Sequence, residues 1–95
     1  MAVGRGWADI EADLRRELAA IGVETVSTYQ KYGWLHAETS PWSPEAQAIC
    51  DSAETRSKST CEDCGEQPAE RHRLPSGWIK TLCDTCWAAK QMEQP

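Results

Sequence analysis

The chain has 95 residues and a formal net charge of −5, and its aromatic residues are five tryptophans and two tyrosines, with no phenylalanine. This length allows one small domain, or two modest lobes, and limits the size of the hydrophobic core. The acidic charge disfavours a general nucleic-acid binder, because phosphate contacts supply most non-specific affinity. No apolar run approaches the length of a membrane span, so we expect no membrane association.

Residues 1–20 do not resemble a signal peptide. They lack an apolar run, and charged residues interrupt the stretch at Asp9, Glu11, Asp13, Arg15 and Arg16. We therefore expect a cytoplasmic protein whose cysteines stay reduced.

The first predicted element is an amphipathic helix that begins at Trp7 and ends before Gly22. Its apolar residues recur at three- and four-residue steps, at Trp7, Ile10, Leu14, Leu18 and Ile21. This spacing forms one stripe of a helix, and Gly22 is a typical residue to follow a helix end. We expect the stripe to be buried in the core, and a symmetric homodimer through this helix is an open alternative.

A β-hairpin and a second helix are predicted next. Residues 23–29 are rich in β-branched and aromatic side chains, and residues 34–38 form the returning strand after a turn at 30–33. A helix then runs over 44–57, with Ser43 as its N-cap and a proline at its first position. Its apolar positions are Ala46, Ile49, Cys50 and Ala53.

Four cysteines near the C-terminus have the spacing of a zinc site. Cys61 and Cys64 form one Cys-x-x-Cys pair, Cys83 and Cys86 form another, and eighteen residues lie between the pairs. Zn²⁺ takes four thiolates in a closed tetrahedron, so we predict one structural zinc ion. Gly65 follows the first pair directly, where an unhindered backbone is needed.

Disulfides and redox catalysis are the main alternatives for these cysteines. Catalytic thiols need cationic neighbours that lower the thiol pKa, but the acids Glu62, Asp63 and Asp84 lie inside the two pairs. The fifth cysteine, Cys50, lies on an apolar helix stripe and is expected to be buried rather than to act as a nucleophile or ligand. No catalytic constellation involves His36 or His72, so the sequence predicts a non-enzyme.

Taken together, the elements predict an α+β fold. It consists of an N-terminal helix, a β-hairpin and a second helix, followed by a four-cysteine zinc ribbon with a short terminal helix. We assign residues 1–59 to the helix–hairpin–helix lobe and residues 60–95 to the ribbon, packed together as one small domain.

A basic and aromatic patch is the candidate partner-binding surface. Its predicted members are Arg71, Arg73, Trp78 and Lys80, with His72 between the arginines and with Arg56 and Lys58 before the first cysteine pair. The simpler interpretation is that these charges solvate a hairpin and offset the zinc–thiolate charge. Of Trp78 and Trp87, we expect one to cover the metal site and the other to be available to a partner, because Trp and Arg are enriched at binding hot spots.

The ribbon resembles the zinc finger of the DksA/TraR-type proteins, which bind RNA polymerase through its secondary channel. That family uses a long coiled coil with acidic tip residues, and no such coiled coil precedes the finger here. The resemblance rests on Cys61-Glu-Asp-Cys64-Gly65-Glu66, Arg71-x-Arg73-Leu74 and Leu82-Cys83-x-x-Cys86, preceded by a helix.

A longer stretch, from about Val23 to Cys86, is similar to small zinc-ribbon proteins of phages and prophages. We know of no activity shared by that family, so the resemblance implies a fold and a phage origin. It rests on Lys31-Tyr32-Gly33-x-Leu35, Arg56-Ser57-x-x-Thr60-Cys61-x-x-Cys64-Gly65 and Gly77-Trp78-Ile79-Lys80-Thr81-Leu82-Cys83-Asp84.

We therefore predict a protein-binding module, encoded by a phage, that docks on a host protein in the bacterial cytoplasm and modulates or inhibits it. Acidic surfaces can occupy basic nucleic-acid channels, which makes a polymerase or a defence nuclease the natural target class. The alternative is a nucleic-acid-binding zinc-ribbon transcription regulator that uses Arg71, Arg73, Lys80 and a stacked Trp. A redox or hydrolytic enzyme is the least favoured hypothesis.

Overall fold

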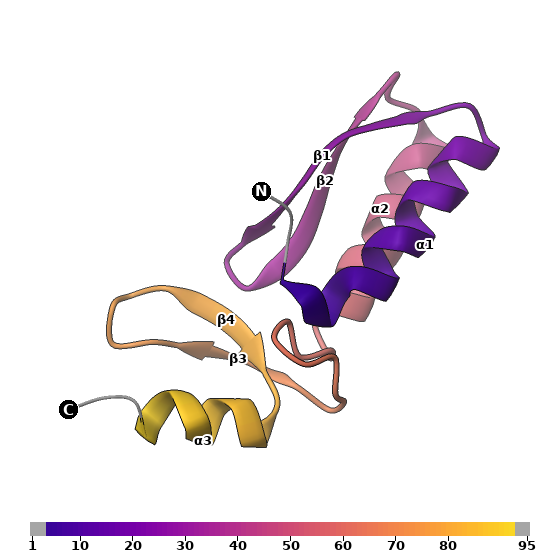
Figure 1. Cartoon of the computed structure of the whole chain (residues 1–95). Coiled ribbons are helices and arrows are strands. Elements are labelled where there is room, and N and C mark those ends of the chain that lie inside the picture. The colour runs from indigo at the N-terminus through magenta and orange to yellow at the C-terminus, as the bar shows by residue number, and fades with distance from the viewer. Residues whose placement is uncertain (1–3, 93–95) are drawn as a thin grey trace.

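Helices and short antiparallel hairpins follow one another along the chain in the computed structural model, which describes residues 4–92 (Figure 1). Residues 1–3 of the predicted helix–hairpin–helix lobe and residues 93–95 of the predicted ribbon lie outside the described residues. The predicted α+β class is confirmed, with the four cysteines clustered in the C-terminal part. The elements are η1 (Arg5–Trp7), α1 (Ala8–Ala20), β1 (Glu24–Lys31), β2 (Trp34–Ser40), α2 (Pro44–Ser57), β3 (Glu70–Arg73), β4 (Ile79–Leu82) and α3 (Asp84–Met92).

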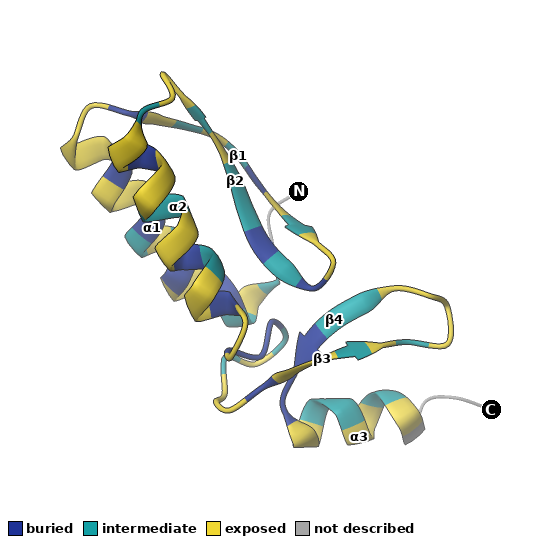
Figure 2. Cartoon of the chain, turned by 180° about the vertical axis from the view of Figure 1, so that it is seen from behind, coloured by how far each residue is buried: buried dark blue, intermediate teal, exposed yellow. Residues whose placement is uncertain are grey.

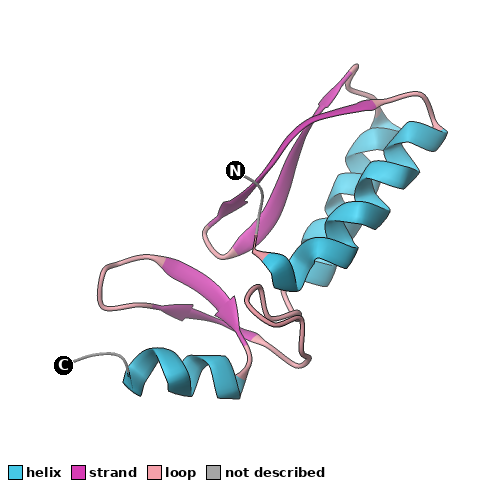
Figure 3. Ribbon diagram, in the orientation of Figure 1, coloured by secondary structure: helices cyan, strands magenta, loops and turns pink. Residues whose placement is uncertain are grey.

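Helices α1 and α2 lie side by side against one face of the β1–β2 hairpin (Figure 3). The apolar stripe of α1 is buried there as predicted, through Ile10, Leu14 and Leu18. Ile21 is the exception, because it lies past the last helical turn and is 40% exposed. Gly22 then adopts a φ of +74° and the chain turns into β1. The core of this lobe consists of Trp7, Ile10, Leu14, Leu18, Val23, Leu35, Ala46 and Ala53.

The turn of the first hairpin is shorter than the sequence predicted. Residues 30–33 were expected to form it, but β1 continues to Lys31, which pairs with Trp34. Only Tyr32 and Gly33 remain in the turn, with φ values of 55° and 85°. Positive φ at both central positions is the geometry of a two-residue hairpin turn that continues the strand twist.

Helix α2 begins and ends where the sequence predicted. The Ser43 hydroxyl accepts a hydrogen bond from the Ala46 amide at 3.1 Å, which confirms the N-cap. At the other end, the hydroxyl of Ser57 accepts a hydrogen bond from the buried Leu35 amide at 2.9 Å and so ties the helix to β2. Cys50 packs on the edge of the core and is half-buried, so the expected burial is only partial.

The C-terminal part is a second, smaller hairpin covered by α3. Strands β3 and β4 pair in antiparallel fashion. Three of the four paired cysteines, Cys61, Cys83 and Cys86, belong to this core or pack against it, whereas Cys64 is exposed. The chain is elongated, with extents of 48 × 22 × 19 Å, and the loop that carries the first cysteine pair lies between its two halves (Figure 1). Within residues 4–92, no helix has both the length and the apolar character needed to cross a bilayer.

Candidate functional site

Four cysteines from separate parts of the C-terminal half converge on one point. Cys61 and Cys64 lie in the loop between α2 and β3, Cys83 follows β4, and Cys86 lies in the first turn of α3. All four Sγ atoms lie within 4.8 Å of one another, and those of Cys64 and Cys83 are 3.6 Å apart. The predicted clustering of these side chains is confirmed.

The sulfur spacing fits a tetrahedral metal site and not a disulfide. Four thiolates at about 2.3 Å from one ion stand about 3.8 Å apart, whereas the bonded sulfurs of a disulfide are about 2.05 Å apart. All five cysteines are free thiols, and Cys50 lies in the other core, away from the cluster. The four clustered cysteines could therefore hold one metal ion.

The first cysteine pair sits in a tight loop that its neighbours stabilise. The Cys61 carbonyl accepts a hydrogen bond from the Gly65 amide at 2.8 Å, and the Cys61 amide donates to the Glu66 carbonyl at 2.9 Å. Gly65 has a φ of +85°, which confirms the predicted need for an unhindered residue at this position. In the second pair, the Cys83 carbonyl accepts from the Trp87 amide at 2.8 Å.

The loop gives the thiols different tendencies to ionise. Burial raises the pKa of Cys61, but hydrogen bonds from the backbone of Cys83, Cys64 and Asp63 outweigh it and lower the pKa to about 7. Burial, together with the neighbouring thiols, raises the pKa of Cys86 well above its usual range. An incoming cation must therefore displace protons from part of the cluster.

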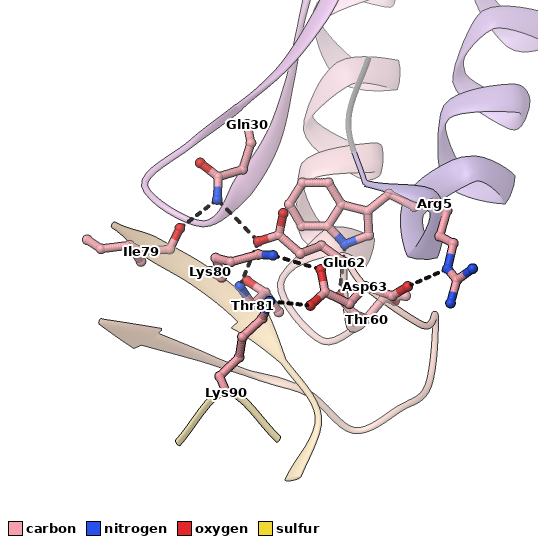
Figure 4. A network of polar contacts seen from close by, with 10 residues as sticks. Arg5, Gln30, Thr60, Glu62, Asp63, Ile79, Lys80, Thr81 and Lys90 are labelled. Carbon is pink, nitrogen blue, oxygen red and sulfur yellow. Dashed lines mark hydrogen bonds and ion pairs between the residues drawn. The ribbon is translucent and has the colours of Figure 1, made fainter. Parts of the chain in front are cut away.

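Residues 5–7 pack directly on the loop of the first cysteine pair. The sequence analysis did not connect this segment with the cysteines. The Gly6 amide donates to the Glu62 carbonyl at 2.9 Å, and the Arg5 Nε donates to the Asp63 carbonyl at 3.2 Å (Figure 4). The buried indole of Trp7 donates to the Thr60 carbonyl at 2.8 Å. The start of the helical lobe is thus fixed to the loop that carries Cys61 and Cys64, and the only sequence signal for it is the Gly-x-Gly-Trp segment at residues 4–7.

Side chains from both hairpins also meet at this loop (Figure 4). The buried carboxylate of Glu62 accepts hydrogen bonds from the Gln30 amide group and from the Thr81 backbone N–H, both at 3.1 Å. Its pKa is raised, chiefly by burial. The Gln30 side chain also donates to the Ile79 carbonyl, at 2.5 Å, and so bridges from β1 to β4.

Two of the predicted partner-binding residues are occupied within the chain. Lys80 forms a 2.7 Å ion pair with Asp63 beside the first cysteine pair. Arg71 lies 4.5 Å from the centre of the Trp34 ring, and Lys58 lies 4.2 Å from the same ring. Lys80 and Arg71 are thus engaged with other side chains of the chain. The simpler interpretation, that these charges solvate a hairpin and offset the zinc–thiolate charge, stays a prediction.

Trp87 and Trp78 differ as expected, one covering the site and one exposed. Trp87 packs against the cysteine core and stacks on His72, with ring centroids 4.2 Å apart. His36 is likewise engaged elsewhere, in a 3.3 Å contact with Glu54, so neither histidine joins the cysteine cluster. Trp78 is 59% exposed.

Trp78 lines a groove between the turns of the two hairpins. The turn of the second hairpin is largely exposed, whereas in the first turn Tyr32 is exposed and Gly33 is buried (Figure 2). Tyr32, which the sequence analysis did not select, is 64% exposed on the other hairpin turn and lines the same groove. The groove has a volume of about 410 Å³. Its lining residues are Gln30, Lys31, Tyr32, Arg73, Gly77, Trp78 and Ile79.

Comparisons of this chain with protein-family models, with curated proteins and with solved structures find no match.

Proposed function

We propose that the protein is a non-enzymatic zinc-ribbon module, encoded by a phage, that docks on a host protein and modulates or inhibits it. The ion assigned to the cysteine cluster is Zn²⁺, because four thiolates in a closed tetrahedron are its usual structural site. The target class remains a polymerase or a defence nuclease, whose basic channels suit an acidic protein. The phage origin rests on the resemblance of residues 23–86 to small phage zinc ribbons.

One observation carries the docking role: Tyr32 and Trp78 flank a single groove from two different hairpins. Large aromatic side chains are usually buried, and those at binding interfaces supply much of the affinity. Each ring is more than half exposed, and each lies at a turn where it adds nothing to either core. In this role the metal acts indirectly, since it holds the second hairpin in the position that completes the groove.

Affinity capture from host lysate tests the proposal. The bait is the full-length, zinc-loaded chain, compared with a Tyr32→Ser/Trp78→Ser double variant. Trp42→Ser is the matched control, because Trp42 is equally exposed, at 65%, but follows β2 at the far end of the first hairpin. We expect the wild-type and control baits to recover the same host protein and the double variant to lose it. Failure of the wild-type bait to recover any protein above background contradicts the proposal.

Binding of single-stranded nucleic acid by a transcription regulator is the second candidate. The same groove favours it, because exposed aromatic rings beside Lys31 and Arg73 could stack bases and contact phosphates. The net charge of −5 opposes it. Retardation of a labelled single strand that weakens steeply with salt, and that the Tyr32→Ser/Trp78→Ser variant loses, would favour this candidate over the first.

A further inference from the structure

We infer that the groove between the hairpin turns binds a short, extended acidic segment of the partner protein. Carboxylates of that segment would meet Lys31 and Arg73, and an apolar side chain would lie between Tyr32 and Trp78. This inference rests on the proposed docking function and specifies what the docking surface recognises.

The charge of the groove differs in sign from that of the whole chain. The chain carries a net charge of −5, yet the lining residues of the groove include Lys31 and Arg73 and no aspartate or glutamate. A carboxylate placed here meets two cations, and Glu62, which accepts a hydrogen bond from the lining residue Gln30, is buried. Electrostatic complementarity of this kind selects partners and sets their orientation.

Arg73 is the cation best placed to bind a carboxylate. Across residues 4–92, its guanidinium has no recorded hydrogen bond, ion pair or ring contact, whereas Arg71 and Lys80 are engaged. Lys31 likewise forms no ion pair within that range and only contacts the Tyr32 ring, 5.6 Å from its centre. A planar guanidinium binds a carboxylate with two parallel hydrogen bonds, so a free arginine beside exposed rings favours an acidic ligand.

The shape of the surface favours an extended segment over a compact ligand. Arg73 also lines a second groove, of about 380 Å³, on the other side of the second hairpin, together with Leu74, Pro75 and Trp87. Arg73 therefore lines both grooves. An extended chain advances about 3.3 Å per residue, so a few residues span from one groove across Arg73 to the other.

A peptide fits this surface better than a nucleic-acid strand. A strand carries a phosphate at every nucleotide and needs a track of cations, but only Lys31 and Arg73 are cationic in the groove. Asp63 lies near the adjacent loop and already occupies Lys80. One or two carboxylates match the available cations, and a longer polyanion does not.

Selection from a displayed library of random linear peptides, with the full-length zinc-loaded chain as target, tests the inference. We expect enriched peptides to combine Asp or Glu with Leu, Ile, Phe or Trp. Fluorescence polarisation then measures one enriched peptide against Arg73→Gln and Trp78→Ser, with Arg15→Gln and Trp42→Ser as controls. Arg15 is a matched control because it is an exposed cation on α1 with only a 3.7 Å contact to Glu11.

Arg73→Gln and Trp78→Ser should each raise the dissociation constant about tenfold or more, since a charged hydrogen bond or a buried ring is lost. The two controls should change it less than about twofold. Replacing the peptide's Asp and Glu by Asn and Gln should weaken binding as much as Arg73→Gln does. Oligothymidylate at physiological salt should not displace the peptide.

Several results would overturn the inference: no enrichment, enrichment of basic peptides, unchanged binding by Arg73→Gln, or displacement by oligothymidylate. The docking function can fail separately. If lysate capture depends on Tyr32 and Trp78 but Arg73→Gln captures normally, the docking function stands and acidic recognition is wrong. If the peptides bind through Arg73 while lysate capture fails, the recognition stands and the host-protein role is wrong.

Discussion

Gly6 lies against the first cysteine pair, where its backbone packs on the backbone of residues 61–65. A Cβ at this position would come within 2.1 Å of the Cys61 carbonyl oxygen and 2.6 Å of the Gly65 amide nitrogen. Neither contact involves a flexible side chain, so one of the two backbone segments must move. The residue therefore links the position of helix α1 to the geometry of a cysteine that could bind metal.

Gly6→Ala should lower both the stability of the fold and its affinity for zinc. The steric cost is about 1–3 kcal/mol, as for other overpacked sites. Thermal unfolding and competition with a chromophoric chelator measure the two effects. Gly22→Ala is the control, because Gly22 has a φ of +74° but open space around it. It should cost about 1 kcal/mol of stability through backbone strain and leave zinc affinity unchanged. Equal zinc affinity in the two variants would refute the coupling.

Among individual residues, the sequence predicted those whose spacing along the chain indicates their chemistry. Cys61, Cys64, Cys83 and Cys86 could be identified because two short pairs around a hairpin restrict the possible geometry. Gly6 and Trp7 could not be connected with them, since the contact spans more than fifty positions and depends on how the helical lobe packs. Arg73 and Arg71 look alike in sequence, and only packing shows that one is engaged and the other is not.

The turn of the first hairpin carries an unfavourable residue. Tyr32 adopts a φ of 55°, a region that bulky residues avoid and that Asn or Gly occupies at this position of most such turns. Its ring contributes nothing to either hydrophobic core. A strained residue that does not support the fold points to a function, which is consistent with the proposed docking surface.

Tyr32→Asn should stabilise the protein while weakening partner capture. Asn tolerates the left-handed conformation, so the free energy of unfolding should rise by a few tenths to about 1 kcal/mol. Denaturant unfolding measures that change, and the capture assay measures the loss of the ring. Tyr32→Phe, which keeps both ring and strain, should alter neither quantity much. If Tyr32→Asn loses stability and keeps capture, the ring is structural and this assignment is wrong.

Elements set by local signals were predictable, and the pairing of the hairpins was not. Two adjacent residues, Ser43 as the N-cap and Pro44 at the first helical position, are enough to specify the start of α2. The turn end of the first hairpin meets strand β4 because the Thr81 hydroxyl donates to the Gly33 carbonyl and because Gln30 bridges to Ile79. These contacts join positions more than forty residues apart, so no local pattern contains them. The length of the first turn was also misjudged, because a tyrosine at its first central position hides the turn signal.

For the whole molecule, the two cores differ in what holds them together. The first core is built from apolar side chains, including the fully buried Trp7 and Leu18. The second contains Ala69 and Leu82, and its other members are Cys61 and Cys83, with Cys86 and Trp87 against them. So small an apolar core offsets little conformational entropy, and metal binding would supply the remaining folding free energy.

Zinc removal should therefore unfold the C-terminal half and spare most of the helical lobe. After chelation, amide protection should disappear over residues 61–86 and persist in α1 and α2, apart from the segment around Gly6 that rests on the cysteine loop. Hydrogen exchange with mass spectrometry measures this directly. Cys64→Ser should produce the same pattern without chelator. Cys50→Ala should not, because Cys50 packs against the other core.

Lowering the pH should have the same effect as chelation, because zinc binds only thiolates. Burial raises the pKa of Cys86. In Cys64 the backbone N–H of Glu66 lowers the pKa, but burial and the thiols of Cys61 and Cys83 raise it above its usual value. Both thiols therefore hold protons at neutral pH in the metal-free protein, and zinc must displace them. Each displaced proton costs about tenfold in affinity per pH unit, so zinc affinity should fall at least about a hundredfold per unit as pH decreases from neutral. A shallower slope in a pH series of zinc titrations would mean that more than two of the four thiols are already ionised before the metal arrives.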